Sequence, residues 1–162
     1  MQEIMLDSFD RAILQALQRD ASLTNAELSE HVNLSQSQCS RRRTRLEQEG
    51  IIQGYSARLD AGQLGYGLRA ITRVNLSTHN ERTDESFVSF LARHEEVREA
   101  YSVSGDADYV LIIVAKDLSA FADFIHLVLL PHPQVARVQS EIALRTMKFE
   151  TGLPIRLSSP SR

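Results

Sequence analysis

Hydrophobic residues near the start of the chain recur at the spacing of an amphipathic helix. They stand at Phe9, Ile13, Leu14 and Leu17, with polar residues between them. Because positions three or four apart share one face of a helix, a first helix is expected over about residues 7–19.

Two capping-box pairs mark where the next two helices begin. Thr24 is followed three residues later by Glu27, and Ser35 is followed by Gln38. Within each pair the two side chains can accept from each other's backbone N–H, which fixes a helix N-terminus. The third helix is expected to end at Gly50, a residue suited to a helix C-cap. Two short helices joined by a tight turn are typical of a helix-turn-helix.

The spacing changes after the third helix. Five of the seven glycines lie between Gly50 and Gly67, so residues 51–66 are expected to form a hinge, with a short strand over 51–59. Further on, apolar residues alternate with period two in several segments. Strands are expected over 68–76, 97–104, 109–115 and 135–142, and helices over about 83–93 and 121–129.

The order βαββαβ in this second half is that of a ferredoxin-like domain. The predicted fold class is therefore α+β. It comprises an N-terminal three-helix (winged) helix-turn-helix domain over residues 1–50, the hinge strand, and a C-terminal ferredoxin-like domain over 67–162.

The segment YVLIIVA, residues 109–115, is apolar at every position. Such a run is typical of a strand that is buried on both faces, yet the helices of a ferredoxin-like domain cover only one face of its sheet. A second copy of the sheet is the simplest cover for the other face. The sequence therefore predicts a homodimer through this domain.

Composition limits the classes of function. The 162 residues carry a net charge of -3, so any affinity for nucleic acid must come from a local basic patch. The single cysteine, Cys39, forbids an internal disulfide and favours a reducing cytoplasm. The acidic N-terminus lacks the apolar region of a signal peptide, and no apolar run is long enough to span a bilayer. We expect a cytoplasmic, nucleoid-associated protein that does not bind membranes.

The third predicted helix carries four arginines within five positions, from Arg41 to Arg45. With Cys39 and Leu46 facing inward, the outward positions are Ser37, Arg41, Thr44, Arg45 and Gln48. Arg42 falls at the inward edge, where it could brace the domain through an acid. Arginine suits both phosphate contact and bidentate reading of guanine, so the helix is expected to enter the major groove of DNA. The alternative is a solvated basic helix without a specific partner.

The predicted DNA-binding residues lie at the starts of the second and third helices and along the third. They are Thr24, Asn25, Ser35, Gln36, Ser37, Gln38, Ser40, Arg41, Arg42, Thr44 and Arg45. Serines at a helix N-terminus suit phosphate, and glutamines can read adenine or donate to phosphate. Cys39 is interpreted as a small apolar packing residue, with a redox sensor as the alternative.

A second feature is the turn Gly105-Asp106-Ala107-Asp108 between two predicted strands. It can be an ordinary hairpin loop of turn-forming residues. It can also bind a free amino acid, because N–H groups at a glycine turn can hold a carboxylate and an aspartate can hold an ammonium group. The predicted effector-binding residues are Ser104, Gly105, Asp106, Ala107, Asp108 and Tyr109.

Signals of an enzyme or of a metal site are poor. The five histidines show no paired metal-ligand spacing, and one cysteine cannot form a CxxC site. No phosphate-binding glycine loop, dinucleotide fingerprint or nucleophile elbow is present. Neither a metal nor a cofactor is expected.

Two long segments together resemble one family. Residues 6–65, from LDSFDRAILQALQRD to the hinge, and the stretch SGDADYVL with the later PHPQV are similar to the Lrp/AsnC, or feast/famine, transcription regulators. The resemblance covers nearly the whole chain. It implies a dimer built through the sheets, often assembled into octamers, with amino-acid effectors bound between dimers near Gly105, Asp106 and Asp108. The chain departs from many relatives at two positions. Ala107 stands where a larger residue is common in the family, and Arg43 stands where an apolar residue is common.

The sequence thus predicts a sequence-specific DNA-binding regulator modulated by a small amino acid or related metabolite. Each dimer is expected to bind double-stranded DNA at a pseudo-palindromic operator. One alternative is an effector-independent protein that organises DNA. A less favoured one is an enzyme like the sirohaem decarboxylases, which share the two-domain plan but need a basic, histidine-bearing pocket.

Overall fold

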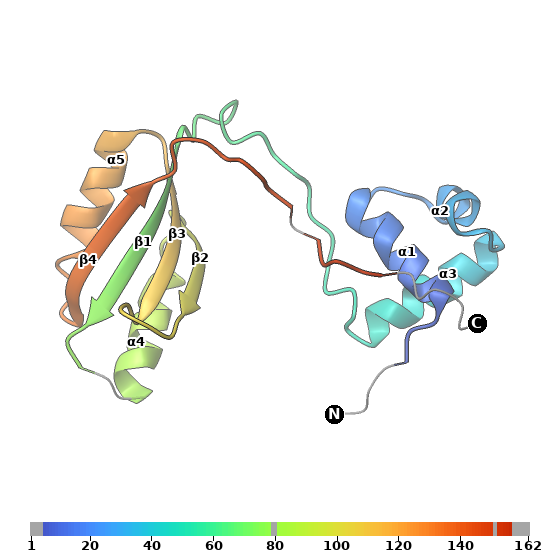
Figure 1. Cartoon of the computed structure of the whole chain (residues 1–162), viewed down its shortest axis with the longest axis horizontal. Helices are drawn as coiled ribbons and strands as arrows, with labels where there is room; N and C mark the ends of the chain where they lie inside the picture. The colour runs from blue at the N-terminus through green and yellow to red at the C-terminus, as the bar shows by residue number, and fades with distance from the viewer. Residues whose placement is uncertain (1–4, 79–80, 151, 157–162) are drawn as a thin grey trace. The chain divides into compact units, whose positions relative to one another are not determined.

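The chain divides into two compact units, shown in Figure 1. A computed structural model describes residues 5–78, 81–150 and 152–156. The helical unit comprises Met1–Arg58 together with Phe149–Arg162, and the sheet unit comprises Leu59–Lys148. The outer ends of the predicted domains, residues 1 and 162, lie outside the described residues.

The helical unit contains α1 (Ser8–Arg19), α2 (Asn25–Val32) and α3 (Gln36–Gln48). Both predicted capping boxes are confirmed, with Thr24 and Ser35 as the N-caps of α2 and α3. A third box, between Asp7 and Asp10, opens α1. Gly50 follows α3 with a φ of 70°, a left-handed conformation that favours glycine. The buried core is Ile13, Leu14, Leu17, Leu28, Val32, Cys39 and Leu46.

The predicted hinge strand over residues 51–59 is not formed within this chain. Residues 53–60 have neither helical nor strand structure, although Ile51 and Ile52 pack against the core of the helical unit. A strand needs a neighbour with which to exchange backbone hydrogen bonds, and no strand of the sheet unit pairs with this segment.

The end of the chain also differs from the prediction, which placed it in the C-terminal domain. The described residues after Phe149 group with the helical unit instead. Ile155 packs against the helical core, and the Gln18 side chain on α1 hydrogen-bonds both backbone groups of Leu153. This segment is held by one apolar residue and by two hydrogen bonds to its backbone. Such contacts leave no periodic pattern in the sequence, so the sequence could not predict them.

The sheet unit has the predicted order βαββαβ. Its elements are β1 (Leu68–Leu76), α4 (Glu81–Leu91), β2 (Val97–Ser102), β3 (Tyr109–Ala115), α5 (Leu118–Asp123), η1 (Phe124–Leu129) and β4 (Val135–Ile142). The sheet order is β2-β3-β1-β4, and all three pairings are antiparallel. The last predicted helix becomes an α-helix followed directly by a π-helical turn, η1.

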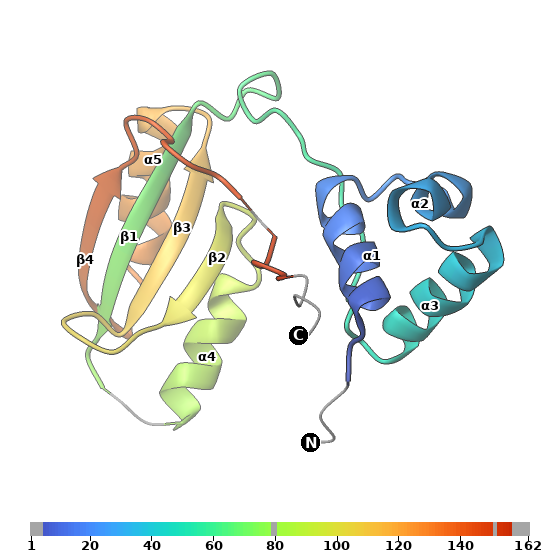
Figure 2. The same ribbon diagram turned by 45° about the vertical axis from the view of Figure 1, so that its right-hand side comes forward.

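The helices cover one face of this sheet (Figure 2). Phe87 and Leu91 from α4 meet Phe121 of α5 and the buried residues of η1, Phe124, Ile125 and Leu129, over the inward side chains of β1 and β3. This packing forms the core of the unit. Burial alternates along both central strands, so every second residue faces away from the helices and is only half buried.

Candidate DNA-binding and effector sites

The first turn of α3 presents polar side chains to solvent. Ser35, Gln36, Ser37 and Gln38 are all exposed. The Ser35 hydroxyl accepts from the Gln38 N–H, and the Gln38 side-chain oxygen accepts from the Ser35 N–H at 3.0 Å. The cap therefore holds Ser35 and Gln38, and the Ser37 hydroxyl lies 3.1 Å from the Ser35 hydroxyl. Gln36 extends from a helix end whose free N–H groups favour anions.

Asp10 organises the arginines on the inner side of α3. Its carboxylate is 1% exposed and accepts from Arg42 at 2.7 Å and from Arg45 at 2.6 Å. Arg42 also donates to Asp7 at 2.7 Å, and its hydrogen bonds to Asp10 and Asp7 raise the pKa of its guanidinium. Burial alone would raise the pKa of Asp7, but bonds from the Asp10 N–H and Arg42 hold it below its usual value.

This cluster confirms that Arg42 braces the domain through an acid, while its role as a DNA contact stays a prediction. The Arg45 side chain is 43% exposed and is also ion-paired with Asp10. The sequence did not single out Asp10. Its position three residues after Asp7 is the signal, because a capping-box acid points back toward the start of its own helix.

Arg43 is also engaged within the helical unit, through its Nε and Nη1 atoms. It donates to the Tyr55 hydroxyl at 2.9 Å and to the Leu23 carbonyl at 3.0 Å, and its guanidinium stacks 4.7 Å from the Tyr55 ring centre. The Tyr55 hydroxyl in turn donates to Glu47 at 2.7 Å. Burial first, then the bond to Glu47, raises the pKa of Tyr55. Arg43 thus fastens the hinge segment and the loop before α2 to α3.

Arg41 differs from its three neighbours. It is exposed, and among the described residues it forms no ion pair. Ser37 and Thr44, four residues before it and three after, are exposed on the same side of α3, and Ser40 is half buried beside them. The structure therefore groups a polar row with one available guanidinium.

The two predicted residues at the start of α2 are less available. Thr24 is exposed, but its side chain is committed to the Glu27 capping box, whose hydrogen bonds lower the pKa of Glu27. Asn25 is half buried, and its carboxamide oxygen is enclosed without a hydrogen-bond partner among the described residues.

The predicted effector loop lies between β2 and β3. Gly105 has a φ of 128°, which a side chain would oppose. The loop is tied to the end of β1: Asn75 donates to the Asp106 carbonyl at 2.7 Å, and the Leu76 N–H donates to the Asp108 carboxylate at 2.7 Å. Nothing in the sequence pattern pointed to Asn75.

These contacts separate the predicted effector residues into two groups. Ser104, Gly105 and Asp106 are exposed, whereas Ala107 and Tyr109 are each 7% exposed and belong to the interior. The Tyr109 ring packs 5.1 Å from Phe87, and its hydroxyl donates to Asp84 at 3.2 Å. Burial first, then Asp84, raises the pKa of Tyr109. The side chains of Ala107 and Tyr109 therefore pack in the interior, and their contact with an effector stays a prediction.

The described residues offer no group of three histidine, cysteine or carboxylate side chains that could hold a metal ion. Within the same part of the chain, no helix has the length and apolar character to cross a membrane. Cys39 is fully buried, and this burial raises the pKa of its thiol, in keeping with a packing role.

Comparisons with known proteins match both units. The model described as "Winged helix-turn-helix DNA-binding" matches residues 6–53, and that described as "Lrp/AsnC ligand binding domain" matches residues 69–153. The chain belongs to the Lrp/AsnC family. These matches confirm the predicted fold class and the resemblance to this family.

Individual relatives are similar over almost their full length. The chain is 38% identical to the transcriptional regulator AzlB of Bacillus subtilis, covering 94% of this chain and 97% of the relative. It is 39% identical to a leucine-responsive regulatory protein of Rhizobium meliloti, covering 90% and 93%. A Neisseria meningitidis transcriptional regulator, solved in complex with L-methionine, is 38% identical with a TM-score of 0.89, covering 93% and 97%. This Lrp/AsnC protein is accordingly a DNA-binding transcriptional regulator with a ligand-binding domain.

Proposed function

We propose that this regulator binds DNA as a homodimer through the exposed row of α3, and that an amino acid at the Gly105 loop modulates the binding. The observation that carries the DNA-binding part is the contrast among the arginines of α3. Arg42, Arg43 and Arg45 are engaged within the protein, while Arg41 stands free beside Ser37 and Thr44. A capped helix with one free guanidinium can enter a major groove without breaking its own contacts.

Within this proposal the residues have distinct tasks. Arg41 and Gln36 read base edges, and Ser35, Ser37 and Thr44 contact phosphates. Gln38, Thr24 and Asn25 support the helix ends, with Ser40 at the edge of the interface. Arg45, which remains 43% exposed, reaches phosphate while keeping its bond to Asp10.

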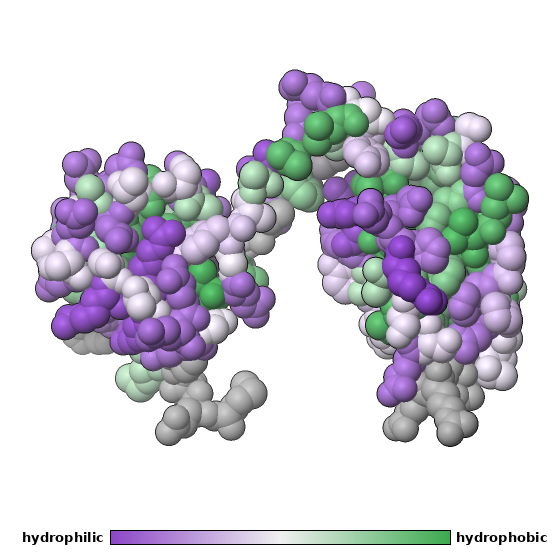
Figure 3. All heavy atoms as spheres, turned by 180° about the vertical axis from the view of Figure 1, so that it is seen from behind, coloured by the Kyte–Doolittle hydropathy of each residue, from purple (hydrophilic) through white to green (hydrophobic). Residues whose placement is uncertain are grey.

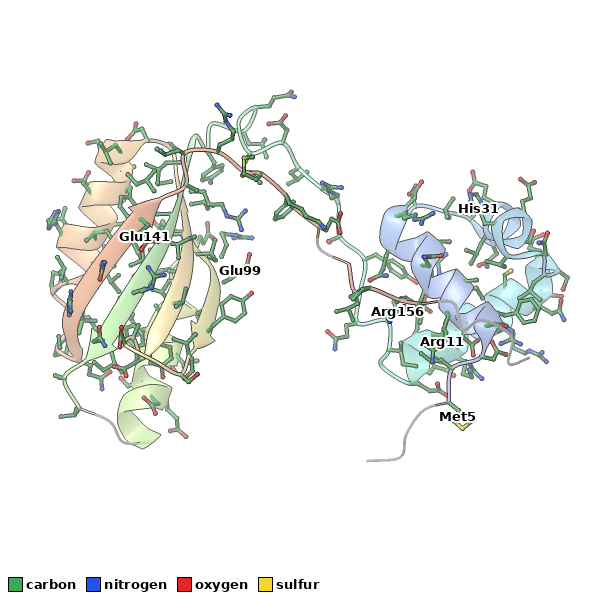
Figure 4. The ribbon with its side chains drawn as sticks, in the orientation of Figure 1. Met5, Arg11, His31, Glu99, Glu141 and Arg156 are labelled. Carbon is green, nitrogen blue, oxygen red and sulfur yellow. The ribbon has the colours of Figure 1, made fainter. Side chains whose placement is uncertain are left out.

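The homodimer is proposed from the uncovered face of the sheet. Ile112 pairs with Ile71 across β3 and β1, and the same row continues to Glu99 on β2 and to Glu141 on β4. Figure 4 labels the two glutamates, which lie on opposite edge strands. Arg69 forms a salt bridge with Glu99 at 3.2 Å, and Arg73 forms one with Glu141. An apolar centre within a charged rim is the anatomy of a protein–protein interface.

The linking segments support the same inference. Figure 3 shows hydrophobic side chains along them. The exposed residues are Leu59, Leu64, Tyr66, Leu144 and Met147, and four of them are at least 57% exposed in the single chain; Tyr66 is 45% exposed. Apolar residues gathered on a connecting segment are typical of surfaces that a partner covers. A second copy would also supply the strand neighbour that residues 51–59 lack in one chain.

Two such helices in a dimer match two half-sites, so the operator is a pseudo-palindrome. Further assembly to octamers, nucleoid association in the cytoplasm and a purely regulatory role without catalysis are part of the same proposal. The effector class is an amino acid, in keeping with the L-methionine bound to the Neisseria relative and the leucine named for the Rhizobium one.

The effector is proposed to bind at the exposed part of the loop. The exposed backbone of Ser104 and Gly105 offers N–H groups to a carboxylate, and the Asp106 side chain offers a carboxylate to an ammonium group. Asp108, bonded to Leu76, keeps the loop in place. To act, the ligand must bind the DNA-competent and incompetent states unequally.

The test is a gel-shift titration on the DNA upstream of the protein's own and neighbouring genes, with and without the twenty amino acids. A specific shift that the pool changes supports the proposal, and dividing the pool names the effector. Asp106→Ala should remove the response while leaving DNA affinity unchanged. A specific shift that ignores the pool would favour the effector-independent DNA-organising alternative, and absence of any specific shift would contradict the regulator proposal for these sites.

A further inference from the structure

The helical unit contains a cavity of about 860 Å³. It lies between α1, residues 51–58 and the C-terminal segment 152–156. Its volume falls in the range of small-molecule pockets. No part of the proposed DNA-binding row or of the effector loop lines it.

The floor of this cavity is apolar. Leu14 and Leu17 on α1 are buried, while Ile51, Ile52 and Ile155 are half buried and pack against the same core. This surface suits a hydrocarbon group, since burying apolar area from water is the main source of favourable free energy in such pockets.

The rim of the cavity carries one sign of charge. Arg11, Arg19, Arg58 and Arg156 line it, and none of the described lining residues is an aspartate or glutamate. Within the described residues none of the four forms an ion pair. Figure 4 labels Arg11, on α1, and Arg156, on the C-terminal segment. The surroundings are therefore complementary to an anion.

Arg11 provides independent evidence that the cavity binds a hydrogen-bond acceptor. Its Nε atom is buried and has no hydrogen-bond partner in the described structure. A buried donor left unpaired costs free energy, and native proteins satisfy almost all such groups. A carboxylate is the partner that a guanidinium binds best, because two oxygens match its fork of N–H groups.

We propose that this cavity binds a small amphipathic carboxylate, with its hydrocarbon tail against Leu14, Leu17 and Ile155 and its head on Arg11 and Arg156. The site is independent of the effector loop in the sheet unit. It touches the hinge residues Ile51 and Ile52, so a ligand there would stabilise the docking of the hinge and C-terminal segments on α1.

The test is calorimetric titration of the full chain with sodium octanoate, using 1-octanol as the uncharged match. Octanoate should bind at least about tenfold more tightly than octanol, because the charged hydrogen bonds to arginine are lost with the alcohol. Equal affinities for the two probes, or no binding of octanoate at millimolar concentration, would overturn the proposal.

Two variants locate the site. Both Arg11→Gln and Arg156→Gln should weaken octanoate binding about tenfold, with the larger loss for Arg11→Gln. Arg156 lies on the exposed C-terminal segment, so its substitution does not put folding at risk. Arg93→Gln, an equal change of charge in the sheet unit, should leave it unchanged, as should Asp106→Ala. If Asp106→Ala abolished octanoate binding while both lining variants kept it, the ligand would belong to the effector loop and the proposal would be wrong.

Discussion

The two units of this regulator leave opposite kinds of surface uncovered. The helical unit buries its apolar residues and exposes a polar row on α3, with Arg41 at its centre. The sheet unit buries one apolar face of its sheet and leaves the opposite face only half buried. Ile71 and Ile112 form a cross-strand pair at the middle of that open face. One surface suits a polyanion, and under our proposal the other is covered by a second copy of the chain, so DNA recognition and self-association would use different units.

The comparison also shows that charge and availability are different properties. On α3 three of four arginines are committed to Asp10, Glu47, Tyr55 or a backbone carbonyl. On the open sheet face Arg69 and Arg73 are paired with the glutamates of the edge strands. The number of arginines on α3 is therefore larger than the number available to DNA. In the same way, the apolar sequence of a strand does not reveal the paired charges that surround it on the sheet face.

The largest effect is expected when a charge is placed at the centre of the open sheet face. Ile112→Lys should raise the dimer dissociation constant at least about a thousandfold, because an unpaired charge buried in an apolar interface costs several kcal/mol. Sedimentation over a range of concentrations measures this. Leu127→Lys, at a 72% exposed position on η1, is the matched control and should leave the dimer intact. A dimer unchanged by Ile112→Lys would move the interface elsewhere.

A smaller loss is expected inside the helical unit. Asp10→Ala should lower its free energy of unfolding by about 2–3 kcal/mol, since Arg42 and Arg45 lose a buried partner but remain partly solvated. Urea unfolding followed by circular dichroism reports it. Glu49→Ala removes a more exposed acid 3.9 Å from Arg45 and should cost no more than about 0.5 kcal/mol. Equal losses for the two variants would show that Asp10 does not organise the arginines.

Local signals predicted most of the fold. Capping boxes at Thr24 and Ser35 gave the helix starts, and β3 and β4 begin and end at the predicted residues. Such features depend on neighbours within a few positions, so the pattern alone contains them. The hinge strand was wrong because pairing needs a second strand, which a local pattern does not supply.

The candidate sites were only partly predictable for the same reason. Helical spacing placed Arg42 at the inward edge of α3 and Arg41 outward, as observed. It did not find that Asp10, on another helix, also holds Arg45, or that Tyr55 stacks on Arg43. It also did not find that Tyr109 turns its ring toward α4. Each of these contacts joins elements distant in sequence, and only the tertiary packing brings them together.

The contrast among the arginines can be sharpened on DNA. Arg41→Ala should weaken operator binding by about 1–3 kcal/mol and, if it contacts phosphate as well, reduce the salt slope by about one. Arg43→Ala should leave the salt slope unchanged, because its guanidinium already donates to Tyr55 and Leu23. Gel shifts at several salt concentrations separate the two variants. Equal slopes and affinities for Arg41→Ala and the parent would remove Arg41 from the interface.

The smallest expected effect is on how the free energy of unfolding of the sheet unit depends on pH. Burial first, then Arg93 and His94, lowers the pKa of His132 below its ordinary value of 6.5. The unfolded chain therefore binds more protons at and just below pH 6.5, so the free energy of unfolding falls as the pH falls through that value. His132→Gln should flatten this dependence between about pH 7.5 and 5.5, measured by urea unfolding.

The exposed His126 provides the control for this prediction, because His126→Gln should keep the slope of the parent. The His132 ring lies 4.4 Å from the Phe90 ring and 5.5 Å from the Phe87 ring, in the core that α4 forms over the sheet. The dependence on His132 should thus appear in the sheet unit and leave operator binding by α3 unchanged. If His132→Gln altered the unfolding of the helical unit instead, the separation of the two units would not hold.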